Sequence, residues 1–361
     1  MTGMLRRFVH DAPAPRVVFG VGALSEVQSE AHRLGGQRIL VISTGSAGLV
    51  ADQVSDSFAD RVVGRIDKVA MHVPADAADA AVRSAEESEC DLLVCLGGGS
   101  AIGLAKAIAR ASGLPILAVP TTYAGSEMTS IWGRTEAGVK TTGRDESVRP
   151  RTVIYDPVLT VGLPRALSAA SGMNAVAHAM EALYAPNATP ATTRLAKEGL
   201  QLLASALPRV VDTPTQIEAR SDALYGAWLC GRVLDATQMG LHHRICHVLG
   251  GTYGLSHSAV HSAVLPYVVS WAQSRVPEAM QVAATALDAS EPGAALWDLA
   301  TRIGAPTSLE EVGFGVENLV EAAMTISKAP PVGPREATFD DVCQILSAAS
   351  VGARPDPSTF G

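Results

Sequence analysis

The stretch LLVCLGGGSAIGLAKAIARASGLPILAVP, residues 92–120, indicates how the first half of the chain folds. Residues 92–96 and 116–120 are short apolar runs typical of buried strands, and residues 101–112 between them have the apolar spacing of a helix. Two strands joined through a crossover helix run parallel in their sheet. The stretch therefore predicts a parallel sheet with helices covering both of its faces.

The same alternation continues on either side of this unit. We expect four further strands at 16–19, 38–43, 69–73 and 152–155, helices at 25–34 and 76–88, and a hairpin within 130–156. After residue 157 we expect only helices, at 164–183, 190–211, 215–235, 239–249, 258–273, 277–288, 293–303, 316–328 and 337–350. The sequence thus predicts an α/β domain with a Rossmann-like sheet over residues 1–158 and an all-helical domain over residues 159–361.

Composition and charge narrow the class of function. Hydrophobic residues make up 47% of the chain and charged residues 18%, so it can bury large cores. A net charge of −8 and the lack of any basic run argue against a nucleic-acid partner, because phosphate binding needs clustered Lys and Arg. The sequence contains no apolar run near the ~18 residues of a membrane span and no signal peptide. Five cysteines, an odd number without a CxxC pair, fit a reducing compartment, so we expect a cytoplasmic protein.

A glycine-rich turn is the first chemical motif. It consists of Gly97, Gly98, Gly99 and Ser100, which follow a predicted strand and open a predicted helix. Glycines let the backbone approach a pyrophosphate closely, and a helix N-terminus presents free N–H groups, although a plain strand-to-helix turn is the alternative. Ser100 can cap the helix or contact a phosphate. Thr121, Thr122 and Tyr123 follow the next strand, so we expect them at the same carboxyl edge, where open α/β sheets bind ligands.

A second glycine pattern, Gly20-Val-Gly22-Ala-Leu-Ser25, resembles the dinucleotide fingerprint GxGxxG, but we interpret it as a turn. No acidic residue closes the strand that follows it, and such a residue holds the cofactor's ribose in that fold. Thr44-Gly45-Ser46 stands there instead. Because an acid would exclude the 2′-phosphate of NADPH, we expect Thr44 to contact the cofactor and NADPH to be accepted at least as readily as by a relative with Asp.

Histidines gather in residues 239–266, MGLHHRICHVLGGTYGLSHSAVHSAVLP. Five of the nine histidines in the chain lie here: His242, His243, His247, His257 and His261. His243 and His247 are four apart and share one helix face, and Gly250 and Gly251 are expected to end that helix. A returning helix then points further imidazoles into the same cleft. A single histidine is usually a hydrogen-bonded core residue, but several around one turn predict an active site.

A polar pair interrupts the apolar helix expected at 164–183. Asn174 and His178 are four apart and lie on one face of this helix. With His243 and His257 they make a four-member set of the kind that binds metals. Asn174 offers only a neutral amide oxygen, however, and an interhelical hydrogen bond is its alternative role.

Several motifs, in order along nearly the whole chain, resemble those of maleylacetate reductases within the iron-containing alcohol dehydrogenase superfamily. They are GGGSAIGLAK at 97–106, PTTYAGSEMT at 120–129, SGMNAVAHAMEALYAP at 171–186, SDALYGAWLCG at 221–231 and HHRICHVLGG at 242–251. The resemblance implies a homodimeric, two-domain NAD(P)H oxidoreductase with the dehydroquinate synthase-like architecture of iron-containing alcohol dehydrogenases. It also implies the reaction: the C=C bond of maleylacetate, a 4-oxo-2-enedioate, is reduced to 3-oxoadipate in aromatic degradation.

Residue roles follow from the resemblance as well. It assigns the glycine turn to the cofactor's pyrophosphate, and Thr121, Thr122 and Lys140 to its phosphate, ribose and nicotinamide side. The positions at which alcohol dehydrogenase relatives hold a metal are here Asn174, His178, His243 and His257. Those relatives have Asp at the first position, whereas maleylacetate reductases share the Asn.

The chain departs from the family pattern in two places. Ser256 and Ala259 stand where a proline and an acidic residue are expected, and Val332-Gly333-Pro334-Arg335-Glu336 stands where an NPRP-type segment is expected. Both places are ones that can line or brace the substrate pocket. The departures leave the exact substrate open, but not the cofactor chemistry.

Reduction of such an enone sets the requirements for catalysis. Hydride adds to the alkene carbon β to the ketone, which leaves an enolate whose oxygen needs a donor and whose α carbon needs a proton. We expect His243 and His178 to stabilise the oxyanion and His247 or His257 to donate the proton, because imidazole titrates near neutrality.

The two substrate carboxylates need cations or N–H groups. Arg244 is the nearest candidate, because guanidinium binds carboxylate bidentately, and a solvated helix-surface role is its alternative. Arg144, in the hairpin, is a second candidate. Tyr123 and Asn174 complete the expected substrate contacts.

Whether the protein binds a metal bears on which reaction it catalyses. Three histidines alone can hold zinc, but neutral ligands leave the charge of the ion uncompensated, so we expect no metal. One alternative is a metal-dependent alcohol dehydrogenase that reduces a simple carbonyl, which Asn174 disfavours. Another is a nucleotide-binding scaffold without catalysis, which the histidines together with the glycine turn disfavour.

Overall fold

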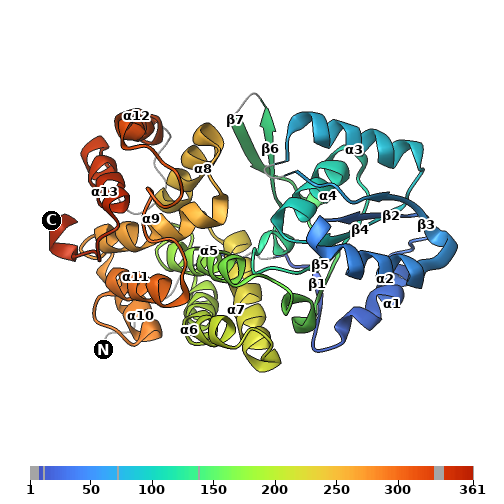
Figure 1. The fold of residues 1–361 in the computed structure, drawn as a ribbon, viewed down its shortest axis with the longest axis horizontal. Coiled ribbons are helices and arrows are strands. Elements are labelled where there is room, and N and C mark those ends of the chain that lie inside the picture. The colour runs from blue at the N-terminus through green and yellow to red at the C-terminus, as the bar shows by residue number, and fades with distance from the viewer. Residues whose placement is uncertain (1–7, 11–12, 71–72, 137–138, 329–336, 361) are drawn as a thin grey trace.

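A computed structural model describes residues 8–10, 13–70, 73–136, 139–328 and 337–360, with the backbone alone described at 139–140. Figure 1 shows two halves side by side, a sheet surrounded by helices and a bundle of helices. All strands formed by the described residues lie in the first half, and the last of them ends at Tyr155. The predicted combination of a parallel α/β region and a helical region is therefore confirmed. The domain boundary at 158/159 stays a prediction.

The main sheet has six parallel strands in the order β1-β8-β5-β4-β2-β3. Their bounds are β1 Arg16–Phe19, β2 Ile39–Ser43, β3 Val62–Ile66, β4 Leu92–Gly97, β5 Ile116–Pro120 and β8 Thr152–Tyr155. Every residue of β2, β4 and β5 is buried, as expected for strands covered on both faces. The register pairs Ser43 with Leu96 and Gly97 with Pro120, so these three strands end at one level along the carboxyl edge.

Helices cover both faces of this sheet, and successive side chains of a strand point to opposite faces. The covering helices are α1 Val27–Arg33, α2 Gly48–Phe58, α3 Ala75–Glu87 and α4 Gly99–Ser112. In β4, Val94 and Leu96 belong to the core under α1 and α2. Leu93 and Cys95 belong to the core under α3 and α4, which continues into the helical half. The two halves therefore share one apolar interior.

The strand expected at 69–73 is wrong. The sheet edge is formed by β3 at Val62–Ile66, and no strand forms at 69, 70 or 73, while 71–72 lie outside the described residues. β3 is a half-exposed edge strand with Gly64 and Arg65 in it, so its alternation is weak in the sequence. Val73 does not pair in the sheet. Its side chain packs against Gly103 of α4, where an added Cβ would lie 2.8 Å from the valine.

The predicted hairpin forms outside the main sheet. β6 (Ile131–Glu136) and β7 (Val139–Arg144) pair antiparallel as a two-stranded unit. Figure 1 shows this hairpin standing beside the gap between the two ribbons of the halves. Its end, Arg144, therefore lies where the hairpin meets the helical half.

The helical half contains nine long helices in its described residues. They are α5 Arg165–Leu183, α6 Pro190–Asp212, α7 Ile217–Ala236, α8 Leu241–Tyr253, α9 His257–Ala272, α10 Pro277–Leu287, α11 Pro292–Ile303, α12 Leu319–Lys328 and α13 Phe339–Val351. Pro190, Pro277 and Pro292 occupy first helical positions, where a missing N–H costs nothing. Within the described chain no helix is both long and apolar enough to cross a membrane.

One predicted helix end is wrong. Gly250 and Gly251 do not terminate α8, which continues to Tyr253 and ends at Gly254 in the left-handed region, with φ +67°. Gly250 is buried inside the helix, where a Cβ would make only an ordinary contact, 3.5 Å from the carbonyl oxygen of Leu255. The loop between the two histidine helices is therefore shorter than expected.

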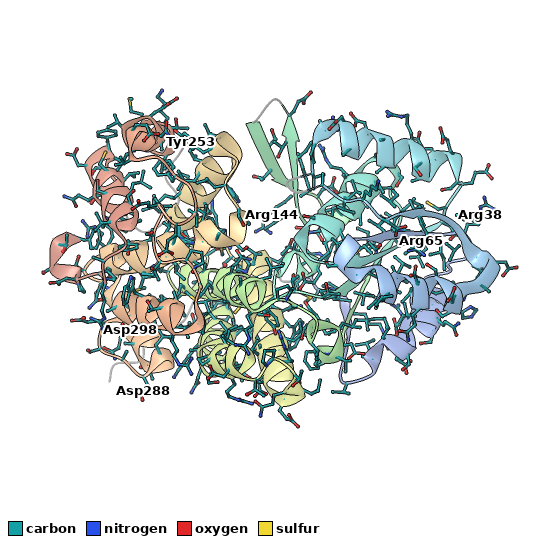
Figure 2. The ribbon with its side chains drawn as sticks, viewed as in Figure 1. Arg38, Arg65, Arg144, Tyr253, Asp288 and Asp298 are labelled. Carbon is teal, nitrogen blue, oxygen red and sulfur yellow. The ribbon has the colours of Figure 1, made fainter. Side chains whose placement is uncertain are left out.

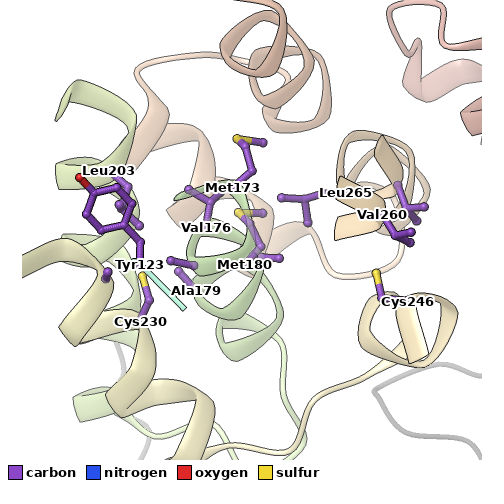
Figure 3. Close-up of a cluster of buried hydrophobic side chains, with 14 of the residues drawn as sticks. Tyr123, Met173, Val176, Ala179, Met180, Leu203, Cys230, Cys246, Val260 and Leu265 are labelled. Carbon is purple, nitrogen blue, oxygen red and sulfur yellow. The ribbon is translucent and has the colours of Figure 1, made fainter. Parts of the chain in front are cut away.

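Helix α5 is the centre of the helical half. Nearly every residue from Ser168 to its end is buried. Figure 3 shows its side chains Met173, Val176 and Met180 between Tyr123 and Cys230 on one side and Val260 of α9 on the other. A helix surrounded in this way keeps its polar side chains in fixed positions.

Candidate active site

The glycine turn between β4 and α4 forms a narrow cradle at the carboxyl edge of the sheet. A Cβ added at Gly97, which has φ +142°, would lie 2.8 Å from Thr44 Oγ1, and one added at Gly98 would lie 3.0 Å from Thr122 Oγ1. The structure thus brings Thr44 and Thr122 to the turn. No side chain caps the N-terminus of α4, so Ser100 does not take the capping role. Backbone N–H groups at an uncapped helix start suit a phosphate group.

Two other residues expected to contact the cofactor are Thr121 and Lys140. Thr121 is half-buried, and its N–H donates to the Gly97 carbonyl at 3.1 Å, which places it directly beside the turn. Lys140 lies in β7 opposite Thr135, and its side chain is outside the described part of the chain. The cradle is therefore built by the turn, Thr44, Thr121 and Thr122.

Six imidazoles from three helices form one cluster. They are His178 of α5, His242, His243 and His247 of α8, and His257 and His261 of α9. His261 is central: its ring centroid lies 4.4 Å from that of His257, 4.7 Å from His242 and 4.8 Å from His243. His247 and His257 stack at 5.9 Å and are half-buried, so they form the more accessible side of the cluster. The expected convergence of histidines is present.

Glu181 of α5 holds the start of α8 and orients one of these rings. Its carboxylate accepts backbone N–H groups of Gly240 at 3.1 Å, His242 at 2.8 Å and His243 at 3.3 Å, and lies 2.5 Å from His243 Nδ1. Burial raises the pKa of Glu181, but the charge and hydrogen bond of His243 outweigh this effect, and the pKa falls to about 2. An ionised Glu181 keeps a proton on Nδ1, which leaves Nε2 of His243 facing the cluster.

Asn174 and His178 both lie against the loop after β5, which comes from the sheet half. Asn174 Nδ2 donates to the Ala124 carbonyl at 3.3 Å, and its Oδ1 is buried without a partner. A Cβ at Gly125, which has φ +83°, would lie 3.4 Å from His178 Nδ1. His178 stacks on His243 with centroids 5.2 Å apart, and burial together with the nearby His243 and His242 lowers its pKa well below the usual range. The loop after β5 therefore lies directly on these two residues.

The sequence alone assigns no role to two members of the site, Glu181 and His261. Glu181 carries one signal, an acidic residue three positions after His178 in the otherwise apolar HAMEAL. His261 is visible in the histidine stretch, but only packing makes it the hub. Its Nδ1 lies 2.8 Å from His242 Nε2, and both rings are fully buried. Burial lowers the pKa of His242 to about 3 and that of His261 well below its usual range.

Two expected substrate contacts, Tyr123 and Arg144, have hydrogen-bond partners within the fold. Tyr123 is fully buried, and its hydroxyl accepts a hydrogen bond from the buried Arg220 at 3.1 Å. Arg144 donates to the carbonyl oxygens of Leu234, Asp235 and Thr237 at the end of α7, and Figure 2 shows it between the hairpin and the helical half. Both side chains therefore join elements of the fold.

The remaining predicted contacts lie on the histidine helices. Arg244 is half-buried on α8, next to His243 in sequence. Burial lowers the pKa of its guanidinium, and Glu181 opposes that shift. Ser256 precedes α9, and Ala259 lies in its first turn, while 332–336 lie outside the described residues.

Known proteins resemble this chain over almost its full length. Residues 14–157 match the family described as iron-containing alcohol dehydrogenase, and residues 168–350 match its C-terminal region. Maleylacetate reductases from Sphingobium indicum and Burkholderia cepacia are 45% and 46% identical, covering 97% of this chain and 99% and 100% of theirs. The crystal structure of maleylacetate reductase from Agrobacterium tumefaciens is 42% identical with a TM-score of 0.92, covering 97% of this chain and all of that one.

Proposed function

The chain belongs to the iron-containing alcohol dehydrogenase family and is an oxidoreductase, and on this premise we propose that it reduces maleylacetate to 3-oxoadipate with NADH or NADPH. The observation that carries the proposal is the segment after β5. At one end Thr122 touches the glycine cradle, and at the other Ala124 and Gly125 touch Asn174 and His178. One short segment thus joins the cofactor cradle to the imidazoles.

The cradle fits the diphosphate of a nicotinamide dinucleotide, because a side chain at Gly97 or Gly98 would fill the space beside Thr44 or Thr122. Gly99, Ser100 and the α4 N-terminus complete this contact. The bound cofactor supplies the hydride. The chain's own residues position the substrate and stabilise the charge that develops on it.

In the proposed mechanism hydride adds to the alkene carbon β to the ketone, and the electron pair of the double bond forms an enolate. His243 and His178 stabilise the enolate oxygen, with Glu181 holding His243 in the orientation needed. His247 or His257, on the accessible side of the cluster, then protonates the α carbon. Arg244 and Asn174 contact the substrate's carboxylates.

The residues that stand at the metal positions of the family are a weaker donor set for a resident iron or zinc than a set that includes a carboxylate. Three imidazoles and the amide of Asn174 carry no negative charge to balance a dication. Among described His, Cys, Asp and Glu residues, the group with three ligand atoms within 4.8 Å is His242, Cys246 and His261, and none of these belongs to the expected set. We therefore propose catalysis without a metal.

Cofactor choice, assembly and location complete the proposal. Thr44-Gly45-Ser46 closes β2 without an acid, which supports acceptance of NADPH beside NADH. The family resemblance supports a homodimer, and five cysteines that form no disulfide support a reducing, cytoplasmic location. A small anionic enone or keto acid is the proposed partner, with no nucleic acid or membrane.

The experiment is oxidation of NADH and NADPH by the purified protein with maleylacetate, beside simple ketones and aldehydes. We expect turnover of maleylacetate that persists after dialysis against a chelator, in protein whose elemental analysis shows no stoichiometric Fe or Zn. Turnover of simple carbonyls alone, dependent on added metal, would replace the proposal with a metal-dependent alcohol dehydrogenase.

A further inference from the structure

A buried lysine ammonium lies within hydrogen-bond distance of five oxygen atoms beside the proposed site. Lys106 of α4 is 1% exposed. Its Nζ lies 2.7 Å from the Ser126 carbonyl, 2.8 Å from the Thr129 carbonyl and 2.7 Å from the Ile131 carbonyl. The hydroxyls of Thr129 and Ser126 follow at 2.9 and 3.4 Å. All five oxygens belong to residues 126–131.

The number of these oxygens is informative. An ammonium group has three hydrogens, so five oxygens within 3.4 Å exceed what directional hydrogen bonds require. Carbonyl oxygens that surround a cation from several sides are how proteins replace the hydration shell of K⁺. These five oxygens, which we call the cage, are therefore arranged like the ligands of a monovalent cation site, and the Lys106 ammonium occupies the position of the cation.

The charge in this cage depends on its surroundings. Burial lowers the pKa of Lys106 to about 7, while the charges of Glu127 and Asp235 oppose that shift. Glu127 is itself fully buried, with Oε1 accepting from the Tyr155 hydroxyl at 2.7 Å and Oε2 without a partner. The five oxygens supply the solvation that water would otherwise give the ammonium.

The caged segment, residues 126–131, directly follows the segment that joins the two parts of the site. It begins just after Gly125, which packs against His178, and a Cβ at Gly231 of α7 would lie 3.1 Å from the Gly125 carbonyl oxygen. From the helical half, Asp235 accepts the Ser130 N–H at 2.9 Å. Lys106 thus fixes this segment from the sheet side and Asp235 fixes it from the helical side.

We propose that Lys106 acts as a tethered monovalent cation, a positioning residue whose ammonium occupies a cation site formed by residues 126–131 and keeps the segment in its reactive shape. Removal of the side chain then turns the protein into one that requires K⁺ or NH₄⁺. The activity part of this proposal rests on the proposed function, whereas the stability part does not.

The test compares Lys106→Ala with the wild type in KCl, NH₄Cl, LiCl and tetramethylammonium chloride at one ionic strength. In tetramethylammonium we expect the variant's kcat/KM to be lower by about tenfold to hundredfold, because the segment is misplaced, and its Tm to be lower by a few degrees. K⁺ and NH₄⁺ restore both values, Li⁺ does not, and the wild type is insensitive to the salt. A stable variant whose Tm and activity are the same in all four salts overturns the proposal.

Two further variants separate the explanations. Lys106→Met keeps the alkyl chain in the cage and is expected to lose activity without recovery in any salt, so recovery equal to that of Lys106→Ala contradicts the proposed site. Lys197→Ala on α6 is the control for loss of a lysine and should resemble the wild type. If Lys106→Ala does not fold in tetramethylammonium, refolding in K⁺ or NH₄⁺ must recover helical protein, and equal failure in every salt overturns the proposal. If the Tm of Lys106→Ala depends on the salt but the wild type does not turn over maleylacetate, the proposed function is wrong and the cation site stands.

Discussion

Replacing Glu181 by Gln tests how the site is organised, because this carboxylate holds both His243, an imidazole that we propose to be catalytic, and the start of α8. The variant keeps the shape of the side chain but loses its charge. It leaves the N–H groups at the start of α8 with one oxygen acceptor in place of two, and it no longer fixes the proton of His243 on Nδ1. We expect both stability and turnover to fall.

The magnitude follows from the carboxyl pKa. Folding lowers the pKa of Glu181 from 4.5 to about 2. This difference corresponds to ~3 kcal/mol of stability at neutral pH. Because the folded-state pKa is the lower one, this contribution is complete above pH 4.5 and disappears as the pH falls toward 2. The variant lacks it at every pH.

Urea unfolding of wild type and Glu181→Gln between pH 7 and pH 2.5 measures the difference directly. We expect a gap of ~3 kcal/mol at pH 7 that closes in acid, and a loss in kcat of about tenfold to hundredfold from the mispositioned His243. Glu198→Gln, at an exposed position of α6, is the matched control and should change neither value. A gap that stays constant from pH 7 to pH 2.5 would refute the reasoning, because it would show that ionisation of Glu181 does not contribute.

Three further predictions concern the cofactor and the metal. Gly98→Ala places a Cβ 3.0 Å from Thr122 Oγ1 and should raise the Kd for NADH by about tenfold in fluorescence titration while the Tm hardly changes; an unchanged Kd would remove the cradle from the site. Thr44→Asp should weaken NADPH more than NADH by about tenfold, since the carboxylate repels the 2′-phosphate, and equal Kd changes would count against Thr44 as a cofactor contact. Asn174→Asp adds the missing negative ligand, so elemental analysis after growth with iron or zinc should show more bound metal than in the wild type; equal metal content would contradict our account of the donor set.

The sequence predicts those parts of the fold whose signals are local. The strands at 92–96 and 116–120 and the helices after residue 157 carry regular apolar spacing, and the family resemblance drawn from the motifs is confirmed by relatives at about 45% identity. β3 was missed because an edge strand with glycine and arginine has little periodicity. α8 ends later than expected because Gly254, rather than the pair Gly250 and Gly251, takes the left-handed conformation that ends a helix.

In the candidate site, too, only the features with a local sequence signal can be predicted. The glycine turn and the histidine stretch are visible in the sequence because residues close in the chain form them. Glu181 and His261 gain their roles from contacts between helices, with 61 residues separating Glu181 from the His242 N–H it accepts. Tyr123 follows the expected strand but points into the core, where Arg220 binds its hydroxyl, and spacing alone cannot indicate that direction.

The buried imidazoles of the cluster also make the stability of the folded protein depend on pH below neutrality. His178, His242 and His261 stay neutral inside the folded protein, whereas in an unfolded chain each takes up a proton below its ordinary pKa near 6.5. Because the unfolded chain binds more protons at these positions, acidification below this pKa favours unfolding. The buried histidines therefore make the folded state less stable as the pH falls, although none of the three lies on the surface.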